Sequence, residues 1–155
     1  MRTIKFRGKR TDNGEWVYGD LTKLITPEGN VGYFIITENK GDFRDDVPVN
    51  SISYTLYNDI FLVSQSSVGQ FTGLHDREGK EIYEGDIVSM LTKRFGEEIF
   101  IIAYEDSHLG AFVLCEGDVH SSFICVFGKN YGYEPYYCEV VGNIHDNPEL
   151  IEKRE

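Results

Sequence analysis

Carboxylates next to histidines are the residues of this sequence that most resemble metal-binding groups. Two of the four histidines are followed directly by aspartate, in His75-Asp76 and His145-Asp146. A metal site needs three or four converging ligands, whereas both of these steps adjoin turns, where aspartate accepts hydrogen bonds from backbone amides. We therefore expect both aspartates to be structural, and we predict no metal and no other cofactor.

Three more acids surround Tyr83, at Glu81, Glu84 and Asp86. In an extended chain Glu84 and Asp86 project to the same side, and two carboxylates can perform acid–base catalysis when their surroundings separate their pKa values. The simpler interpretation is that Gly85 bends the chain into the next strand, while the acids cap amides or stay in solvent. A small hydrolase built on Glu84 and Asp86 is therefore the weakest functional hypothesis.

The three cysteines, Cys115, Cys125 and Cys138, have neither CxxC nor zinc-binding spacing. The first two lie in apolar segments and should be buried as small hydrophobic residues, whereas Cys138 follows two tyrosines and should be partly exposed. Nothing in the spacing places a base beside a thiol, as a cysteine nucleophile requires. Reduced thiols are typical of the cytoplasm. The sequence thus predicts a cytoplasmic protein that is not an enzyme and has no catalytic residue.

The densest aromatic stretch is a candidate interaction surface. Small β-barrels often bind peptides or nucleic acids through exposed aromatic residues. Packing of a loop or a contact between subunits would explain the same stretch. Its tyrosines are Tyr131, Tyr133, Tyr136 and Tyr137.

Charge provides a second candidate surface. The 155 residues include 15 Lys or Arg and 26 Asp or Glu, a net charge of −11, yet residues 1–10 hold five cations and no acid. Lys5, Arg7 and Lys9 alternate along a predicted strand and so share one face. So acidic a chain is a poor ligand for duplex DNA or an anionic membrane, and no apolar run approaches the ~20 residues of a membrane span. We expect the basic strand to support homo-oligomer formation.

Alternating hydrophobic residues and 16 glycines predict a mainly β fold. The polar run at residues 64–67 predicts a boundary between a smaller β-rich N-terminal lobe, residues 1–66, and residues 67–155, whose short strands suggest an SH3-like small barrel. Asp76 and Gly79 fit the first and last positions of a type I turn, and we expect Gly79, its last residue, to have a positive φ. Asn147 as N-cap predicts a short C-terminal helix from Pro148 to about residue 153.

Several stretches of the chain resemble the YopX family. These stretches are residues 4–9 with Trp16 and Gly19, residues 69–76, residues 79–88 and residues 140–150. The resemblance implies a phage or prophage protein with an SH3-type barrel in its C-terminal part, and it brings no established activity or catalytic residue. The central motif that carries it comprises Gly69, Phe71, Thr72, Gly73, Leu74, Asp76, Gly79, Tyr83, Glu84, Gly85 and Asp86.

Two classes of function are therefore open. The first is a non-enzymatic phage or prophage accessory protein in the bacterial cytoplasm that self-assembles and contacts an unidentified host or phage protein, away from membranes. The alternative is nucleic-acid binding by the basic strand, against which the overall acidity argues, or an acidic mimic of DNA that occupies a DNA-binding protein.

Overall fold

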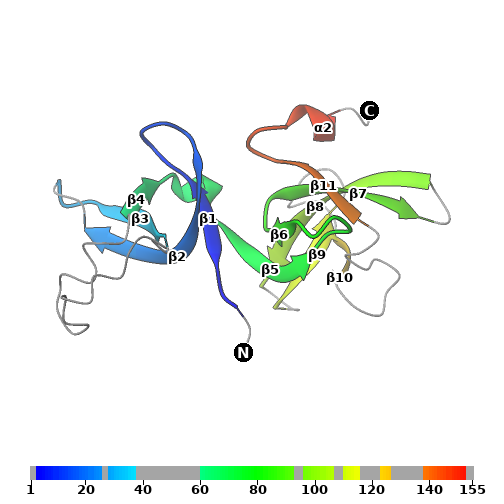
Figure 1. Ribbon diagram of the computed structural model, residues 1–155, viewed down its shortest axis with the longest axis horizontal. Helices are drawn as coiled ribbons and strands as arrows, with labels where there is room; N and C mark the ends of the chain where they lie inside the picture. Colours follow the sequence, from blue (N-terminus) through cyan, green and yellow to red (C-terminus); the bar gives the residue numbers. More distant parts are fainter. Residues whose placement is uncertain are drawn as a thin grey trace. The chain divides into compact units, whose positions relative to one another are not determined.

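Antiparallel strands dominate the structure, a computed structural model, as the sequence predicts. The structure describes residues 3–25, 28–37, 60–92, 96–106, 110–115, 123–126 and 138–152, the range 123–126 by its backbone. The chain divides into two compact units: an N-terminal unit, Ile4–Val68, and a C-terminal unit, Gly69–Glu155, to which Met1–Thr3 also belongs (Figure 1). This division falls two residues after the expected boundary between residues 66 and 67. Within the described ranges, no helix is long and apolar enough to cross a membrane.

The four strands of the N-terminal unit pair antiparallel in the order β4-β3-β2-β1, within the six-stranded order β4-β3-β2-β1-β5-β6. Asparagine and glycine at positions 13 and 14 provide the turn from the first strand to the second, where Gly14 has φ 75°. The strands are β1 (Phe6–Lys9), β2 (Trp16–Ile25), β3 (Val31–Ile36) and β4 (Ile60–Val63), followed by the 3-10 turn η1 (Gln65–Ser67).

The sheet of the N-terminal unit curls until its two edges meet. The Ser64 amide donates to the Lys9 carbonyl at 2.9 Å, and the Thr11 amide donates to the Leu62 carbonyl at 3.1 Å. The end of β4 therefore pairs with the chain that leaves β1. This pairing satisfies backbone groups that an open sheet edge would leave to solvent.

Two glycines permit this curvature. A Cβ on Gly8 would lie 2.9 Å from the Cβ of Val63, and a Cβ on Gly19 would lie 2.0 Å from the Ile36 carbonyl oxygen. Val63 and Ile35 are 3% and 0% exposed, so they lie inside the curled sheet. Because strand side chains alternate, the neighbours of these inner residues project from its outer side.

The C-terminal unit contains a five-stranded antiparallel sheet with the order β10-β9-β8-β7-β11, preceded by the hairpin β5-β6. The closure of these strands into an SH3-like barrel stays a prediction. The hairpin strands are β5 (Gly69–His75) and β6 (Glu81–Tyr83). The sheet strands are β7 (Asp86–Thr92), β8 (Gly96–Glu105), β9 (Ala111–Cys115), β10 (Phe123–Val126) and β11 (Cys138–Asn143).

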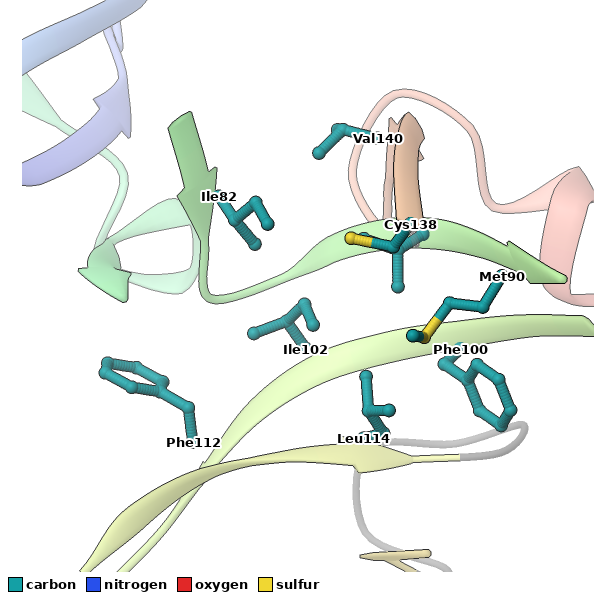
Figure 2. Packing of buried hydrophobic residues seen from close by; sticks show 9 residues of the cluster. Ile82, Met90, Phe100, Ile102, Phe112, Leu114, Cys138 and Val140 are labelled. Atoms are coloured by element: carbon teal, nitrogen blue, oxygen red, sulfur yellow. The ribbon is translucent and has the colours of Figure 1, made fainter. Parts of the chain in front are cut away.

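Both faces of this sheet bury apolar side chains, which explains why β8 contains a continuous apolar run. One face packs around Ile82 of β6, with side chains from four sheet strands pointing into the same space (Figure 2). The other face centres on Ile101 and Val113 and is covered by Ile144 and Ile151. Each fully buried side chain of this size contributes about 1.5–3 kcal/mol.

The C-terminal helix α2 (Glu149–Glu152) begins one residue after the predicted Pro148. Asn147 lies just before it, and the Leu150 amide donates to the Asn147 carbonyl at 3.1 Å. The Asn147 Oδ1 atom accepts a hydrogen bond of 3.3 Å from the Asn143 amide, and its expected role as N-cap stays a prediction. Gly142 leaves room for this side chain, because a Cβ there would lie 2.6 Å from the Asn147 Oδ1 atom. Asn147 thus links the helix to the end of β11.

Candidate functional site

Asp76 binds three backbone amides from two parts of the C-terminal unit. Its Oδ1 atom accepts hydrogen bonds of 2.9 Å from the amides of Glu78 and Lys80, and its Oδ2 atom accepts one of 3.0 Å from the Val140 amide. Burial raises the pKa of Asp76, but the hydrogen bonds from these three amides outweigh it and hold the pKa below its usual value. The capping role predicted for Asp76 is confirmed, and it extends to β11.

The turn that Asp76 opens has the predicted geometry. The Gly79 amide donates to the Asp76 carbonyl at 3.0 Å, and Gly79 has φ 85°. His75 packs its ring edge-on against Phe71, with 5.6 Å between the ring centroids. The His75-Asp76 step is therefore part of the packing and hydrogen bonding of the hairpin.

Two of the three acids around Tyr83 bind different parts of that residue. The Tyr83 amide donates to the Asp86 carboxylate at 2.8 Å, and the Tyr83 hydroxyl donates to the Glu81 carboxylate at 2.6 Å. Asp86 is 2% exposed, so its carboxylate acts as a buried amide acceptor. Gly85 has φ 81°, which allows the chain to bend into β7 as expected. The geometry therefore gives Glu81 and Asp86 structural roles as hydrogen-bond acceptors for Tyr83.

The prediction that Cys138 is partly exposed is wrong. Its side chain is 0% exposed because β11 pairs it with Met90 and turns it toward the core (Figure 2). Burial, followed by the negative charge of Asp76, raises the pKa of the Cys138 thiol to about 12. Such a thiol is a poor nucleophile because little thiolate forms at neutral pH. Cys115 is buried as predicted, and the Cys125 side chain lies outside the described part of the chain.

The turn at His145-Asp146 is organised by a residue that sequence analysis missed. The Asn143 side-chain oxygen accepts hydrogen bonds of 2.9 and 3.0 Å from the amides of His145 and Asp146, and its side-chain nitrogen donates to Asp146. Asparagine at the end of a strand was the available signal. Across the described ranges, no three His, Cys, Asp or Glu side chains are placed to hold a metal ion.

The N-terminal unit brings the predicted basic strand next to two aromatic rings. Arg7 lies 4.7 Å from the centroid of the Trp16 ring and Lys9 lies 5.7 Å from it, while Lys5 lies 5.7 Å from the Tyr18 ring. These distances are within the range of cation–π attraction. Arg7 is 6% exposed, so its role is mainly packing, whereas Lys5 and Lys9 remain partly accessible.

Apolar side chains continue this surface across the sheet, and sequence analysis did not identify them. The exposed fractions are 43% for Tyr18, 44% for Leu24, 37% for Ile60 and 39% for Leu62. The available signal was that apolar residues occupy both faces of β3 and β4. We call the resulting surface the outer face, and it comprises Lys5, Arg7, Lys9, Trp16, Tyr18, Asp20, Thr22, Leu24, Phe34, Ile36, Ile60 and Leu62.

The other candidate surface, formed by Tyr131, Tyr133, Tyr136 and Tyr137, lies outside the described residues. The outer face is therefore the candidate site whose geometry can be analysed.

Comparisons with known proteins relate nearly the whole chain to one family. A family model described as YopX protein matches residues 5–152. Among solved structures, the crystal structure of protein EF1440 from Enterococcus faecalis is 25% identical in sequence, with a TM-score of 0.49. That match covers 98% of this chain and 100% of the other. No curated protein matches the chain.

Proposed function

The chain belongs to the YopX family, and from that premise we propose that it is a non-enzymatic interaction protein that self-associates and binds a partner protein through its outer face. The proposal keeps the setting that the family resemblance implies, an accessory protein of a phage or prophage acting in the bacterial cytoplasm. The partner would be a host or phage protein. Thiols at Cys115 and Cys138, rather than disulfides, fit that compartment.

The observation that carries the proposal is the combination of exposed apolar side chains with cations on one sheet face. Leu24, Ile60 and Leu62 are each more than a third exposed. Lys5 and Lys9 lie on the same face, where they flank Tyr18 and Trp16 of β2. Exposed apolar patches commonly mark contact surfaces. Apolar burial would supply affinity, while the cations would orient the partner.

The chemistry of the central motif supports a protein without catalysis. Its two buried acids, Asp76 and Asp86, accept hydrogen bonds from backbone amides. Its neighbouring thiol, Cys138, is buried with a pKa of about 12. The fold of the C-terminal unit thus explains why these residue types occur in the motif.

The test is the molar mass measured by light scattering after size exclusion, at micromolar concentration and at low and high salt. We expect the wild type to exceed 17.7 kDa, and the mass to fall with salt and with the double change Lys5→Ser and Lys9→Ser. Arg7 is left in place because it packs on Trp16. Lys23→Ser is the matched control, since Lys23 stacks on Tyr33 on the opposite face of the sheet. A monomeric wild type under every condition would contradict self-association.

A second candidate function, binding of single-stranded nucleic acid, is favoured by the proximity of Trp16 and Tyr18 to cations. Aromatic rings beside cations suit stacked bases and their phosphates. Fluorescence anisotropy with a labelled oligonucleotide over a salt series separates the two candidates. Binding that weakens steeply with salt and disappears in the Lys5→Ser, Lys9→Ser variant would favour nucleic acid.

A further inference from the structure

The two units carry very different net charges. Residues 4–68 contain seven Lys or Arg and nine Asp or Glu, whereas residues 69–155 contain seven and 17. The net charge is therefore about −2 for residues 4–68, which form the N-terminal unit, and about −10 for residues 69–155, which make up the C-terminal unit apart from Met1–Thr3. The acidity of the protein is concentrated in the unit that does not carry the basic strand.

The outer face is the positive counterpart of this acidic unit. Its cations are Lys5 and Lys9, which are partly accessible, and Arg7, which is 6% exposed, and the acidic residue within it is Asp20. The outer face therefore combines local positive charge with accessible apolar area.

Strand register places the apolar part of the outer face in one contiguous block. Phe34 lies opposite Leu62, and Ile36 lies opposite Ile60, on neighbouring strands β3 and β4. Side chains directly opposite each other on one sheet face are about 5 Å apart at Cβ, so these four form a continuous apolar square. The cations of β1 lie beyond β2 on the same face. A partner must therefore offer apolar contact at one side and acidic groups at the other.

We propose that the outer face of one copy binds the acidic C-terminal unit of a second copy, head to tail. This inference rests on the proposed self-association and specifies which surfaces meet. Pairing two outer faces would bring Lys5 and Lys9 of both copies together, and pairing two C-terminal units would oppose about −10 with about −10. Like-charge juxtaposition disfavours both arrangements, whereas the head-to-tail arrangement pairs opposite charges.

Head-to-tail contact has a consequence that distinguishes it from a symmetric dimer. The two surfaces that meet are different, so a pair of copies leaves one outer face and one C-terminal unit unoccupied. Such a contact continues into a ring or a longer assembly. A variant with a damaged outer face would still offer its C-terminal unit to the wild type, and it would end the assembly there.

The first experiment uses such a variant, Lys5→Ser, Lys9→Ser, Leu24→Ser, all on the outer face. Alone, this variant should be monomeric by light scattering. A fluorescently labelled sample of it should nevertheless co-elute with the wild type. When the two are mixed in equal amounts, the mean mass of the assemblies should fall toward two copies. Labelled Lys23→Ser should enter the assemblies without shortening them. A triple variant that never co-elutes with an oligomeric wild type would overturn the head-to-tail arrangement.

The second experiment identifies the contacting surfaces directly. A photo-crosslinking residue replaces Leu24 or Leu62, and an equal mixture of ¹⁴N- and ¹⁵N-labelled protein distinguishes links between copies from links within one. Links between copies should lead to residues 69–155. Ile25, 76% exposed and on the opposite side of β2 from Leu24, is the matched control and should give few such links.

The remaining outcomes overturn one proposal or both. Links from Leu24 or Leu62 to the outer face of a second copy, or only to residues of the same chain, would overturn the head-to-tail contact. If the wild type is still oligomeric in that case, the proposed self-association stands. If nuclease treatment lowers the mass of the wild-type assembly, nucleic acid joins the copies, and the head-to-tail contact is overturned as well. A monomer throughout would overturn both proposals.

Discussion

Asp76 and Val140 are 64 positions apart in the chain and are joined by a hydrogen bond of 3.0 Å from the Val140 amide to the Asp76 carboxylate. The same side chain also binds the amides of Glu78 and Lys80. One carboxylate therefore fixes the turn between β5 and β6 and attaches that turn to β11. Buried acceptors of this kind are costly to remove because the amides lose their partners.

We expect Asp76→Asn to destabilise the C-terminal unit by about 1–3 kcal/mol. The asparagine keeps one acceptor oxygen but turns an NH₂ group toward an amide that needs an acceptor. Urea unfolding followed by far-UV circular dichroism measures the change. Asp12→Asn is the control, since Asp12 is exposed and pairs with Arg10, and it should leave the midpoint unchanged. Equal midpoints for Asp76→Asn and wild type would refute the structural role.

Acid should weaken the C-terminal unit through Asp76. Its pKa in the folded protein is below the usual 3.8, so the unfolded chain binds the proton more readily. The stabilisation from Asp76 is therefore fully present above about pH 4 and is lost as the pH falls through the lower, folded-state pKa. The melting temperature measured from pH 7 to pH 2 should fall less steeply in Asp76→Asn than in wild type. Parallel curves would show that other groups govern acid stability.

Gly79 offers a test of backbone strain without steric conflict. Its φ is 85° and a Cβ there would meet no atom within 4 Å, so a substitution costs only conformational energy. We expect Gly79→Val to cost about 1–2 kcal/mol and Gly79→Asn to cost less, because asparagine tolerates this conformation. Thermal unfolding of both variants compares them. Equal stability of the valine and asparagine variants would contradict the positive φ.

Gly8 tests the closure of the N-terminal unit. We expect Gly8→Ala to destabilise this unit by about 1–3 kcal/mol, because its Cβ would lie 2.9 Å from Val63. Val63→Ala in the same chain should recover part of that loss, giving a coupling energy in a double-mutant cycle. Trp16, the single tryptophan of the chain, lies in this unit, so its fluorescence reports its unfolding. Additive effects of the two substitutions would argue against contact between these positions.

Local patterns predicted the parts of this structure that depend on few neighbouring residues. Alternation indicated the strands, and the spacing of Asp76 and Gly79 predicted a turn with the observed φ of 85°. The role of Asp76 as an amide acceptor followed from its place in that turn, but its bond to Val140 did not, because that partner is distant in the sequence.

Features that depend on distant pairing were not predictable in this way. The burial of Cys138 is set by its pairing with Met90 on β7, and a single strand does not reveal which of its faces meets the core. Likewise, the curled N-terminal sheet requires Ser64 to bond with Lys9. The outer face became recognisable only once the register of four strands was known, since exposure of Leu62 follows from that register.

The distance along the chain between Asp76 and Val140 also sets an order of events during synthesis. At 5–20 residues per second, the ribosome needs roughly 3–13 s to add the 64 residues that separate them. Through that interval the Asp76 carboxylate can hold only the two amides of its own turn. We therefore expect the C-terminal unit to complete its folding after β11 has left the ribosome, which makes a nascent chain that ends before Val140 susceptible to proteolysis.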